Sequence, residues 1–213
     1  TKTTRTFILK ATCRFVLSSK VLSENISMNA DSENYPCAIL HVDGDSFFVG
    51  CELTKRPDLR GRPVVTGHER GIATAMSMEA KALGIIRAMP VARIMREFPQ
   101  VTVLSSDYES YATYSRRMKD VVRRYTSEVE DYSIDECFAD LSDLEDPEAI
   151  ATQIKHDLQS ELGMTFSVGL SVTKVLAKTA SKRDKPNGLT FVPKDAVEEL
   201  LRALDDAVRA GKI

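Results

Sequence analysis

The spacing of apolar and polar residues along the chain predicts a mixed fold of helices and strands. The short apolar run 38–42 ends in Asp43-Gly44-Asp45, which indicates a buried strand with acidic residues at its C-terminal end. A helix over 46–54 should follow, because apolar residues recur there at helical spacing before Arg56-Pro57 ends the pattern. The same criteria predict strands at 64–66, 72–76, 128–134, 137–141, 166–170 and 188–192, and helices at 78–83, 106–125, 147–162, 173–182 and 194–203, with a short helix between Pro90 and Pro99.

The order of these segments is typical of one α+β architecture. Only Asp135 and Glu136 separate the strands 128–134 and 137–141, and so short a connection requires a hairpin. With an inserted section from about 60 to 100 set aside, the remaining order is close to the split βαβ, or ferredoxin-like, arrangement. We therefore predict a ferredoxin-like α+β fold with a small insertion.

Composition and charge narrow the class of protein. The 213 residues include 29 basic and 31 acidic side chains, a net charge of −2, which argues against binding nucleic acid or anionic lipid by bulk charge alone. A hydrophobic fraction of 43% is ample for a packed core, and no apolar run approaches the roughly 20 residues needed to span a bilayer. The four cysteines are far apart and form no CxxC pair, which favours a reducing interior over a zinc site or a disulfide scaffold.

The N-terminal part of the chain differs from the rest. Residues 1–27 hold five basic side chains against one acidic side chain, a local charge of 5 − 1 = +4. The stretch could be an amphipathic targeting presequence, an unprocessed extension, or upstream sequence carried in by a misplaced start, with Met28 as the initiator. Disorder or a misplaced start is the favoured interpretation, although two short apolar segments would also allow an ordered strand or helix. We treat residues 1–36 as a leader that is disordered or non-native.

Three carboxylates are expected at one edge of the predicted sheet. Asp43 ends the first strand, and Asp135 and Glu136 lie in the hairpin between the two middle strands, which a ferredoxin-like sheet brings close to the first strand. Crowded carboxylates resist ionisation unless a cation compensates them, and hard oxygen ligands suit Mg²⁺ or Mn²⁺ rather than zinc. Two such ions can support phosphoryl transfer. For either motif taken alone, the structural interpretation is favoured: Asp43 and Asp45 would cap the next helix, and Asp135-Glu136 would be an ordinary polar turn.

Several longer motifs, which occur in unbroken order along the chain, favour the metal-binding interpretation over the structural one. They are His41-Val42-Asp43-Gly44-Asp45-Ser46-Phe47-Phe48, Tyr132-Ser133-Ile134-Asp135-Glu136, Ser167-Val168-Gly169-Leu170-Ser171 and Lys185-Pro186-Asn187-Gly188. Over residues 37–205 the chain resembles the Y-family DNA polymerases, the translesion enzymes of the DinB and UmuC type. The resemblance implies a palm at 37–60 and 101–192, fingers at 61–100 and the start of a truncated thumb connection at 193–213. Family members continue into a thumb and a little finger, so the chain is expected to comprise palm and fingers only.

The resemblance also assigns roles at the acidic edge. Asp43, Asp135 and Glu136 would be catalytic and would hold two Mg²⁺ ions, for which Mn²⁺ can substitute, and the Gly44 carbonyl would ligate the ion on the nucleotide side. Phe48 would be the steric gate that excludes a ribose 2′-hydroxyl. Both Phe47 and Phe48 are assigned to nucleotide binding by the resemblance. Because adjacent residues cannot face the same side of a helix, one of the two rings is also expected to belong to the core while the other lies in the site.

Basic residues complete the implied site. Lys185 and Lys81 would contact the triphosphate of the nucleotide. Lys81 stands where many members carry arginine, and Met78 stands where tyrosine is common, and both departures weaken the expected contacts. Lys174, Lys178 and Lys182 are spaced by four on one helical face, which suits DNA phosphates or, alternatively, a solvated charged face.

Two polar residues near the acidic edge are interpreted as structural. Asp45 is taken as a cap of the following helix rather than a ligand, and His41 matches no catalytic arrangement.

The expected function is that of an error-prone translesion DNA polymerase core, which adds deoxynucleotides to a primer 3′-hydroxyl by two-metal phosphoryl transfer. Its partners would be primer-template DNA, dNTP and, through regions outside this chain, a sliding clamp, with no membrane partner. The oligomeric state is left open, and the expected location is the cytoplasm, at the nucleoid in a bacterium. The alternative is a catalytically weak or silent polymerase remnant that binds a nucleotide or a partner. A nucleotidyl cyclase on the same palm topology would leave the polymerase motifs unexplained.

Overall fold

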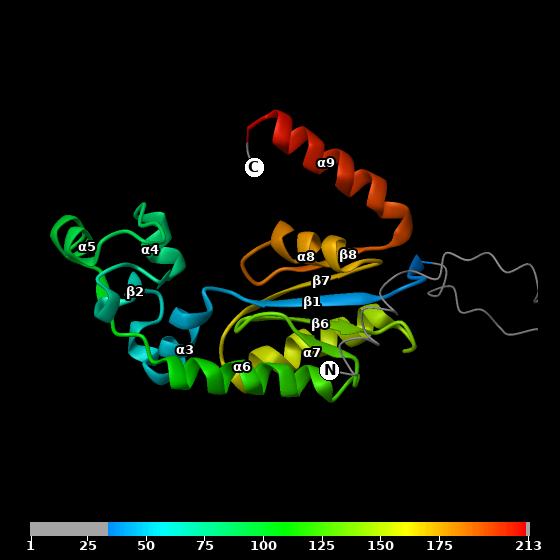
Figure 1. The fold of residues 1–213 in the computed structure, drawn as a ribbon, viewed down its shortest axis with the longest axis horizontal. Helices are drawn as coiled ribbons and strands as arrows, with labels where there is room; N and C mark the ends of the chain where they lie inside the picture. Colours follow the sequence, from blue (N-terminus) through cyan, green and yellow to red (C-terminus); the bar gives the residue numbers. More distant parts are fainter. Residues whose placement is uncertain (1–33, 212–213) are drawn as a thin grey trace, which may run out of the picture.

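The large sheet is the centre of the fold. The computed structural model describes residues 34–211, so the prediction for the leader falls almost wholly outside the described residues (Figure 1). Five strands form this sheet in the order β5-β6-β1-β7-β8. Their bounds are β1 Ile39–Gly44, β5 Val129–Asp131, β6 Glu136–Asp140, β7 Phe166–Ser171 and β8 Leu189–Val192.

The strand directions identify the topology. β1 runs antiparallel to both β6 and β7, and β5 pairs antiparallel with β6. The strand order β5-β6-β1-β7 is the ferredoxin-like arrangement, in which one helix precedes the β5-β6 hairpin along the chain and another follows it. β8 extends this sheet by a parallel pairing with β7. The predicted α+β fold class is therefore confirmed.

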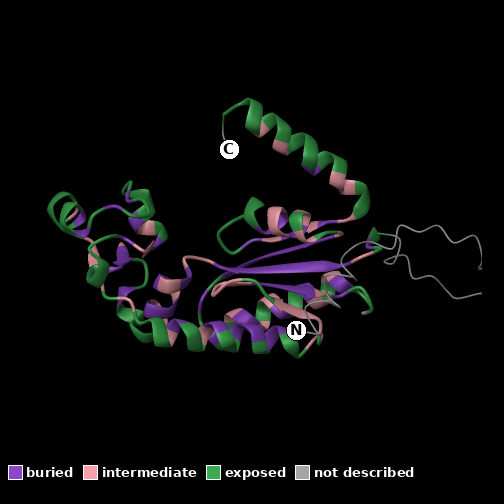
Figure 2. Cartoon of the chain, in the orientation of Figure 1, coloured by how far each residue is buried: buried purple, intermediate pink, exposed green. Residues whose placement is uncertain are grey.

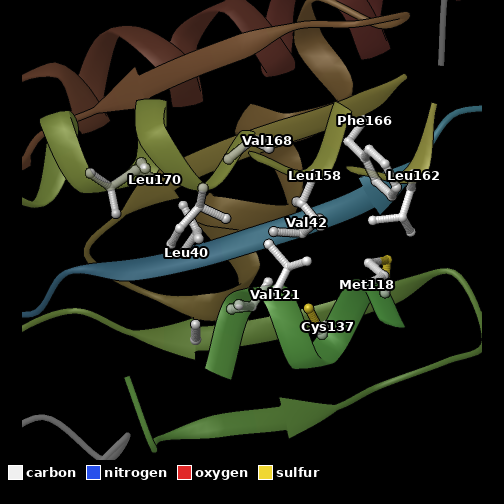
Figure 3. Packing of buried hydrophobic residues seen from close by; sticks show 14 of the residues in the cluster. Leu40, Val42, Met118, Val121, Cys137, Leu158, Leu162, Phe166, Val168 and Leu170 are labelled. Carbon is white, nitrogen blue, oxygen red and sulfur yellow. The ribbon is translucent and has the colours of Figure 1, made fainter. Parts of the chain in front are cut away.

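Helices cover both faces of the large sheet (Figure 1). α6 Tyr108–Arg123 and α7 Pro147–Leu162 lie side by side on one face, and α8 Lys174–Arg183 packs on the other, against β7 and β1. β1 is buried along its whole length for this reason, as the purple strand in Figure 2 shows. The apolar side chains of β1 interlock with those of β7, α6 and α7 to form the main core (Figure 3); among them are Leu40, Val42, Met118, Val121, Leu158 and Val168.

α8 approaches the sheet unusually closely. A Cβ atom on Gly169 of β7 would lie 2.2 Å from the carbonyl oxygen of Ala177 and 2.4 Å from the backbone nitrogen of Ser181. The helix backbone can therefore rest on the strand only because residue 169 has no side chain. This approach brings α8 within reach of residues on β1.

A second, smaller sheet is built by the insertion. Its order is β3-β2-β4, with β2 Val64–Thr66, β3 Ala75–Met76 and β4 Thr102–Leu104. α3 Phe47–Lys55 links it to β1, while α4 Met78–Ala82 and α5 Val91–Glu97 follow β3. The small sheet has its own hydrophobic cluster around Val65, Ile85 and Ile94.

The insertion differs from the sequence prediction in two places. The expected strand at 72–76 is limited to Ala75–Met76, because the preceding segment pairs elsewhere: Ile72 forms a bridge with Pro90, and Ala73 N–H donates to the Met89 carbonyl. β4 is a strand that the sequence did not predict, and it draws residues 102–104 into the small sheet by parallel pairing with β2. The division into palm and fingers at residue 100 stays a prediction.

The chain beyond β8 forms a one-turn 3₁₀ helix, Lys194–Ala196, and then α9 Val197–Arg209, longer than the helix expected at 194–203. α9 touches α8 and β8 through apolar residues near its start, including the buried Leu200, and its far end projects from the sheet (Figure 1). Within residues 34–211, no helix is both long enough and apolar enough to cross a membrane.

Candidate active site

Strand register brings the acidic residues together. Asp43 at the end of β1 is paired with Glu136 at the start of β6, and the Gly44 N–H donates to the Asp135 carbonyl at 2.9 Å. Asp43, Gly44, Asp135 and Glu136 therefore occupy one edge of the large sheet, as the sequence predicted for the carboxylates. The close fit of β1 to α3 explains the glycine, because a Cβ atom at position 44 would lie 2.6 Å from Cδ2 of Phe47.

Each carboxylate at this edge has a hydrogen-bonding or charged partner. Lys185 Nζ lies 2.5 Å from Asp43 Oδ1, and Lys178 Nζ lies 2.9 Å from Glu136 Oε1. The Ser133 hydroxyl donates to Asp135 Oδ1 at 2.7 Å. Among residues 34–211, no three His, Cys, Asp or Glu side chains converge in an arrangement that would already hold a metal ion.

The electrostatics of the edge nevertheless suit a cation. The pKa of Asp43 is raised to about 6, mainly by burial and also by the charges of Glu136 and Asp135, while Lys185 opposes the shift. Burial also acts to raise the pKa of Glu136, but the hydrogen bond and charge of Lys178 lower it overall. These are hard oxygen donors of like charge, the donor set that Mg²⁺ prefers, so the residues fit the divalent cation that the family resemblance implies.

A buried histidine adjoins the same carboxylate cluster. His41 on β1 is fully buried, its ring lies 4.6 Å from the Phe138 ring, and its Nδ1 lies 2.7 Å from Ser181 Oγ on α8. Its Nε2 lies 3.7 Å from Glu136 Oε1 and has no hydrogen-bond partner among the described residues. Burial lowers the pKa of His41 to about 4, although Glu136 opposes this, so the ring is neutral at neutral pH. The sequence prediction gave His41 no role at the acidic edge, although residues two apart on a strand share a face, so its spacing from Asp43 was a usable signal.

A cavity of about 700 Å³ opens beside the carboxylates, a volume typical of small-ligand sites. It lies between the end of β1 and the small sheet. Of the predicted site residues, its lining includes Asp43, Gly44, Phe47, Phe48, Lys81, Asp135 and Lys185. The structure thus gathers most of the predicted site around one cavity. Arg87 also lines it, and no local signal in the sequence singled out that residue.

The two adjacent phenylalanines divide between core and cavity. Phe47 is 3% exposed and belongs to the main core, although its edge also reaches the cavity lining. Phe48 is partly buried at the cavity wall, with its ring stacked on Tyr111 of α6 and edge-on to Tyr108. Tyr111 is fully buried and donates its hydroxyl to Glu52 Oε1 at 2.8 Å, so the support behind Phe48 is fixed by a buried hydrogen bond.

The predicted DNA-contacting lysines on α8 do not share one environment. Lys174 pairs with Glu130, and Lys178 pairs with Glu136 while lying 4.4 Å from the centre of the Tyr132 ring. Lys182 has no ion pair within the part of the chain that the structure describes. The regular spacing therefore places two of the three lysines against acids of the β5-β6 hairpin. Lys81 lies apart from them, at the cavity, and donates to Ser46 Oγ at 3.1 Å.

The prediction that Asp45 caps the following helix is wrong. The N-cap position of α3 is Ser46, in a left-handed conformation and without a side-chain cap hydrogen bond. The Asp45 carboxylate turns away from the helix: its Oδ1 accepts from the Ser167 hydroxyl at 2.7 Å and its Oδ2 accepts from the Asn187 N–H at 2.8 Å. Both donors come from segments more than 100 residues away, so local sequence could not reveal them.

Comparison with known proteins places this geometry in context. A family model described as the impB/mucB/samB family matches residues 42–182. DNA polymerase IV of Lactococcus lactis subsp. cremoris (strain MG1363) is 38% identical over 176 residues, which cover 78% of this chain and 48% of the relative. DNA polymerase IV of Alkalilimnicola ehrlichii is 39% identical over 173 residues, with coverage of 78% and 49%. The chain thus spans about half the length of the curated relatives it matches.

Solved structures show the same likeness in three dimensions. A Dbh ternary complex with partially disordered substrates superposes with a TM-score of 0.73 at 27% identity, over 77% of this chain and 50% of the other. The crystal structure of DinB from Sulfolobus solfataricus superposes with a TM-score of 0.72 at 27% identity and the same coverage.

Proposed function

Because the chain belongs to the impB/mucB/samB family, whose solved relatives are Y-family DNA polymerases, we propose that it carries the nucleotidyl-transfer centre of a translesion DNA polymerase. The substrates would be a primer-template DNA and a dNTP, and the reaction would join the α-phosphate to the primer 3′-hydroxyl with release of pyrophosphate. The observation that carries the proposal is the register of Asp43 with Glu136, next to Asp135, at the mouth of a nucleotide-sized cavity.

The acidic residues would hold the divalent ions. Asp43 and Asp135 would bind both ions, Glu136 would complete the site nearer the primer, and the Gly44 carbonyl would contribute on the nucleotide side. When bound, Mg²⁺ or Mn²⁺ supplies the positive charge that favours an ionised 3′-hydroxyl and a departing pyrophosphate. The buried Asp43 supports this role, because a compensating cation would favour the ionised form of its carboxyl group.

The remaining cavity residues would bind and select the nucleotide. Lys185 and Lys81 line the cavity with ammonium groups that suit triphosphate oxygens. Phe48 would lie under the sugar, where its ring, backed by Tyr111, leaves no space for a 2′-hydroxyl. Lys182 would face DNA phosphate more readily than Lys174 or Lys178, which are paired with Glu130 and Glu136.

Primer extension by this chain with Mg²⁺ or Mn²⁺ tests the proposal. We expect extension by the unmodified chain, and losses of about 10³-fold or more for Asp135→Ala and for Glu136→Ala, because each removes a ligand from the reacting centre. Asp143→Ala is the matched control, since this exposed carboxylate lies beyond the opposite end of β6 and should leave activity unchanged.

Two results would contradict the proposal in different ways. Activity that survives both substitutions would refute the assignment of Asp135 and Glu136. The unmodified chain could instead bind dNTP but extend no primer at any enzyme concentration. That result would favour the alternative of a polymerase remnant that binds nucleotides.

A further inference from the structure

Asp45 is a carboxylate beside the candidate active site that the proposed reaction does not use. It lies two residues after Asp43, where β1 turns into α3. Its two oxygens accept from different segments: one from the Ser167 hydroxyl on β7, the other from the Asn187 N–H in the turn between α8 and β8. A side chain whose two oxygens join two distant segments acts as a brace between them.

The turn that Asp45 holds is the one that carries Lys185. Asn187 is fixed from both sides, because its N–H donates to Asp45 while its side-chain oxygen accepts from Lys155 Nζ at 2.8 Å and from Gln159, both on α7. Its φ of 62° is a conformation that asparagine tolerates better than most residues. The turn is thus clamped between α7 and the end of β1.

One turn therefore contacts both acidic residues at the end of β1. Asn187 binds Asp45 through its backbone, and Lys185, two residues earlier, places Nζ 2.5 Å from Asp43. A lysine side chain loses considerable conformational freedom when its ammonium is held at one point, so an anchored backbone two residues away reduces the number of positions that the ammonium can reach. Asp45 also lines a small hollow of about 150 Å³ together with Lys81 and Lys185.

We propose that Asp45 is a positioning residue: its bond to Ser167 holds the carboxylate against β7, its bond to Asn187 fixes the 185–188 turn, and together they aim Lys185 at the nucleotide phosphates. This inference rests on the proposed function for the role of Lys185, but the brace itself does not. In this role Asp45 acts as a hydrogen-bond acceptor, and each of its two oxygens receives one protein donor.

The choice of substitution separates these roles. Asp45→Ala removes both hydrogen bonds. Asp45→Asn can keep both without charge, since its oxygen can accept from the Asn187 N–H and its NH₂ can donate to Ser167 Oγ. If Asp45 has a positioning role, Asp45→Asn should retain the nucleotide binding that Asp45→Ala loses. If Asp45 is a metal ligand, Asp45→Asn should weaken binding nearly as much as Asp45→Ala. Asp140→Ala is the matched control, because Asp140 also ends a strand and accepts from a nearby serine, Ser142, but at the other end of β6.

The first measurement is the dissociation constant for dATP, taken with Mg²⁺ and a primer-template whose primer ends in a dideoxynucleotide. We expect Lys185→Ala and Asp45→Ala each to weaken binding about tenfold, Asp45→Asn to stay within about twofold, and the Asp45→Ala, Lys185→Ala double variant to be no weaker than Lys185→Ala alone. Effects that multiply in the double variant, or an asparagine variant as weak as the alanine variant, would overturn the inference.

The second measurement is hydrogen exchange of the Asn187 amide, which requires no nucleotide. Exchange should be at least tenfold faster in Asp45→Ala than in the unmodified chain or in Asp45→Asn, and unchanged in Asp140→Ala. Equal exchange in all four proteins would overturn the brace. If the unmodified chain binds no dATP, the proposed function fails, and the exchange rates still decide whether Asp45 holds the turn.

Discussion

The ring of Phe48 stacks on the ring of Tyr111, with centroids 4.5 Å apart and planes within 11° of parallel. The hydroxyl of Tyr111 is in turn bonded to Glu52, which also pairs with Lys55 at 2.9 Å. The cavity wall at Phe48 is therefore supported by a buried aromatic residue and a buried hydrogen bond, so the wall cannot retreat easily from a larger ligand. Such rigidity is what exclusion of one additional hydroxyl group requires.

Truncation of the Phe48 side chain should allow ribonucleotides to be incorporated. We expect Phe48→Ala to raise the ratio of kcat/KM for rNTP to that for dNTP by about tenfold or more, because the space for a 2′-hydroxyl opens when the ring is lost. Phe48→Tyr keeps the ring and should leave the ratio close to that of the unmodified chain. Single-nucleotide insertion assays measure both, and an unchanged ratio in Phe48→Ala would refute the gate.

Removing the hydroxyl behind the gate should reduce stability. Tyr111→Phe leaves Glu52 without its buried donor, and we expect a loss of about 1–2 kcal/mol in the free energy of unfolding. Tyr132→Phe is the control, since Tyr132 is 55% exposed and its hydroxyl can be solvated, and its effect should be within about 0.5 kcal/mol. Urea denaturation of the three proteins provides the comparison, and equal midpoints would show that the Tyr111 bond contributes nothing.

The acidic edge should make stability depend on pH. The pKa of Asp43 is raised from 3.8 to about 6, so between these values the folded protein keeps a proton that the unfolded chain releases. The free energy of unfolding contributed by Asp43 is then greatest below about pH 4 and is lost as the pH rises through about 6. His41, whose pKa is lowered to about 4, contributes the opposite trend in the same range.

Comparison of the unmodified chain with Asp43→Asn isolates the contribution of Asp43 to the pH dependence of stability. We expect the stability of the unmodified chain, measured without divalent cations and relative to that of Asp43→Asn, to fall between pH 4 and pH 6. Chemical denaturation at several pH values measures this difference. A difference that stays constant, or that rises with pH, would contradict the raised pKa.

Gly169 should tolerate no side chain. Gly169→Ala would force its Cβ to within 2.2 Å of the Ala177 carbonyl oxygen, so α8 must move away from the sheet, at a cost of about 3 kcal/mol or more. Gly50→Ala is the control within α3: its Cβ would meet the flexible Met164 side chain at 3.3 Å, and alanine favours the helix, so we expect little change. Thermal unfolding distinguishes the two, and similar melting temperatures would show that α8 adapts.

The sequence predicted most accurately those elements whose ends are set by neighbouring residues. The helix expected at 147–162 has those bounds in the structure, because Asp146 caps it, Pro147 starts it and Gly163 ends it. The hairpin around Asp135-Glu136 and the acidic edge followed from strand order, since β1 and β6 are neighbours in this topology. The resemblance to a known family then supplied roles for residues such as Phe48 that no spacing could assign.

What the sequence did not reveal depends on partners far along the chain. β4 is a short, half-buried strand that exists because β2, nearly 40 residues earlier, pairs with it. The regular spacing of Lys174 and Lys178 suggested one phosphate-binding face, but strand register places Glu130 and Glu136 against them. Asp45 was misassigned for the same reason, because its donors, Ser167 and Asn187, lie in segments that only the folded sheet brings near.

The two sheets keep separate hydrophobic clusters, although they share one cavity. The carboxylates belong to the large sheet, whereas Lys81 and Arg87 come from the inserted section. Substitutions that repack the cluster around Val65 and Ile94 can therefore reshape the cavity wall formed by the inserted section while Asp43 and Glu136 stay in register. Under the proposed function, this arrangement would leave evolution free to vary the nucleotide contacts of the inserted section independently of the acidic edge and of Phe48, which packs against the main core.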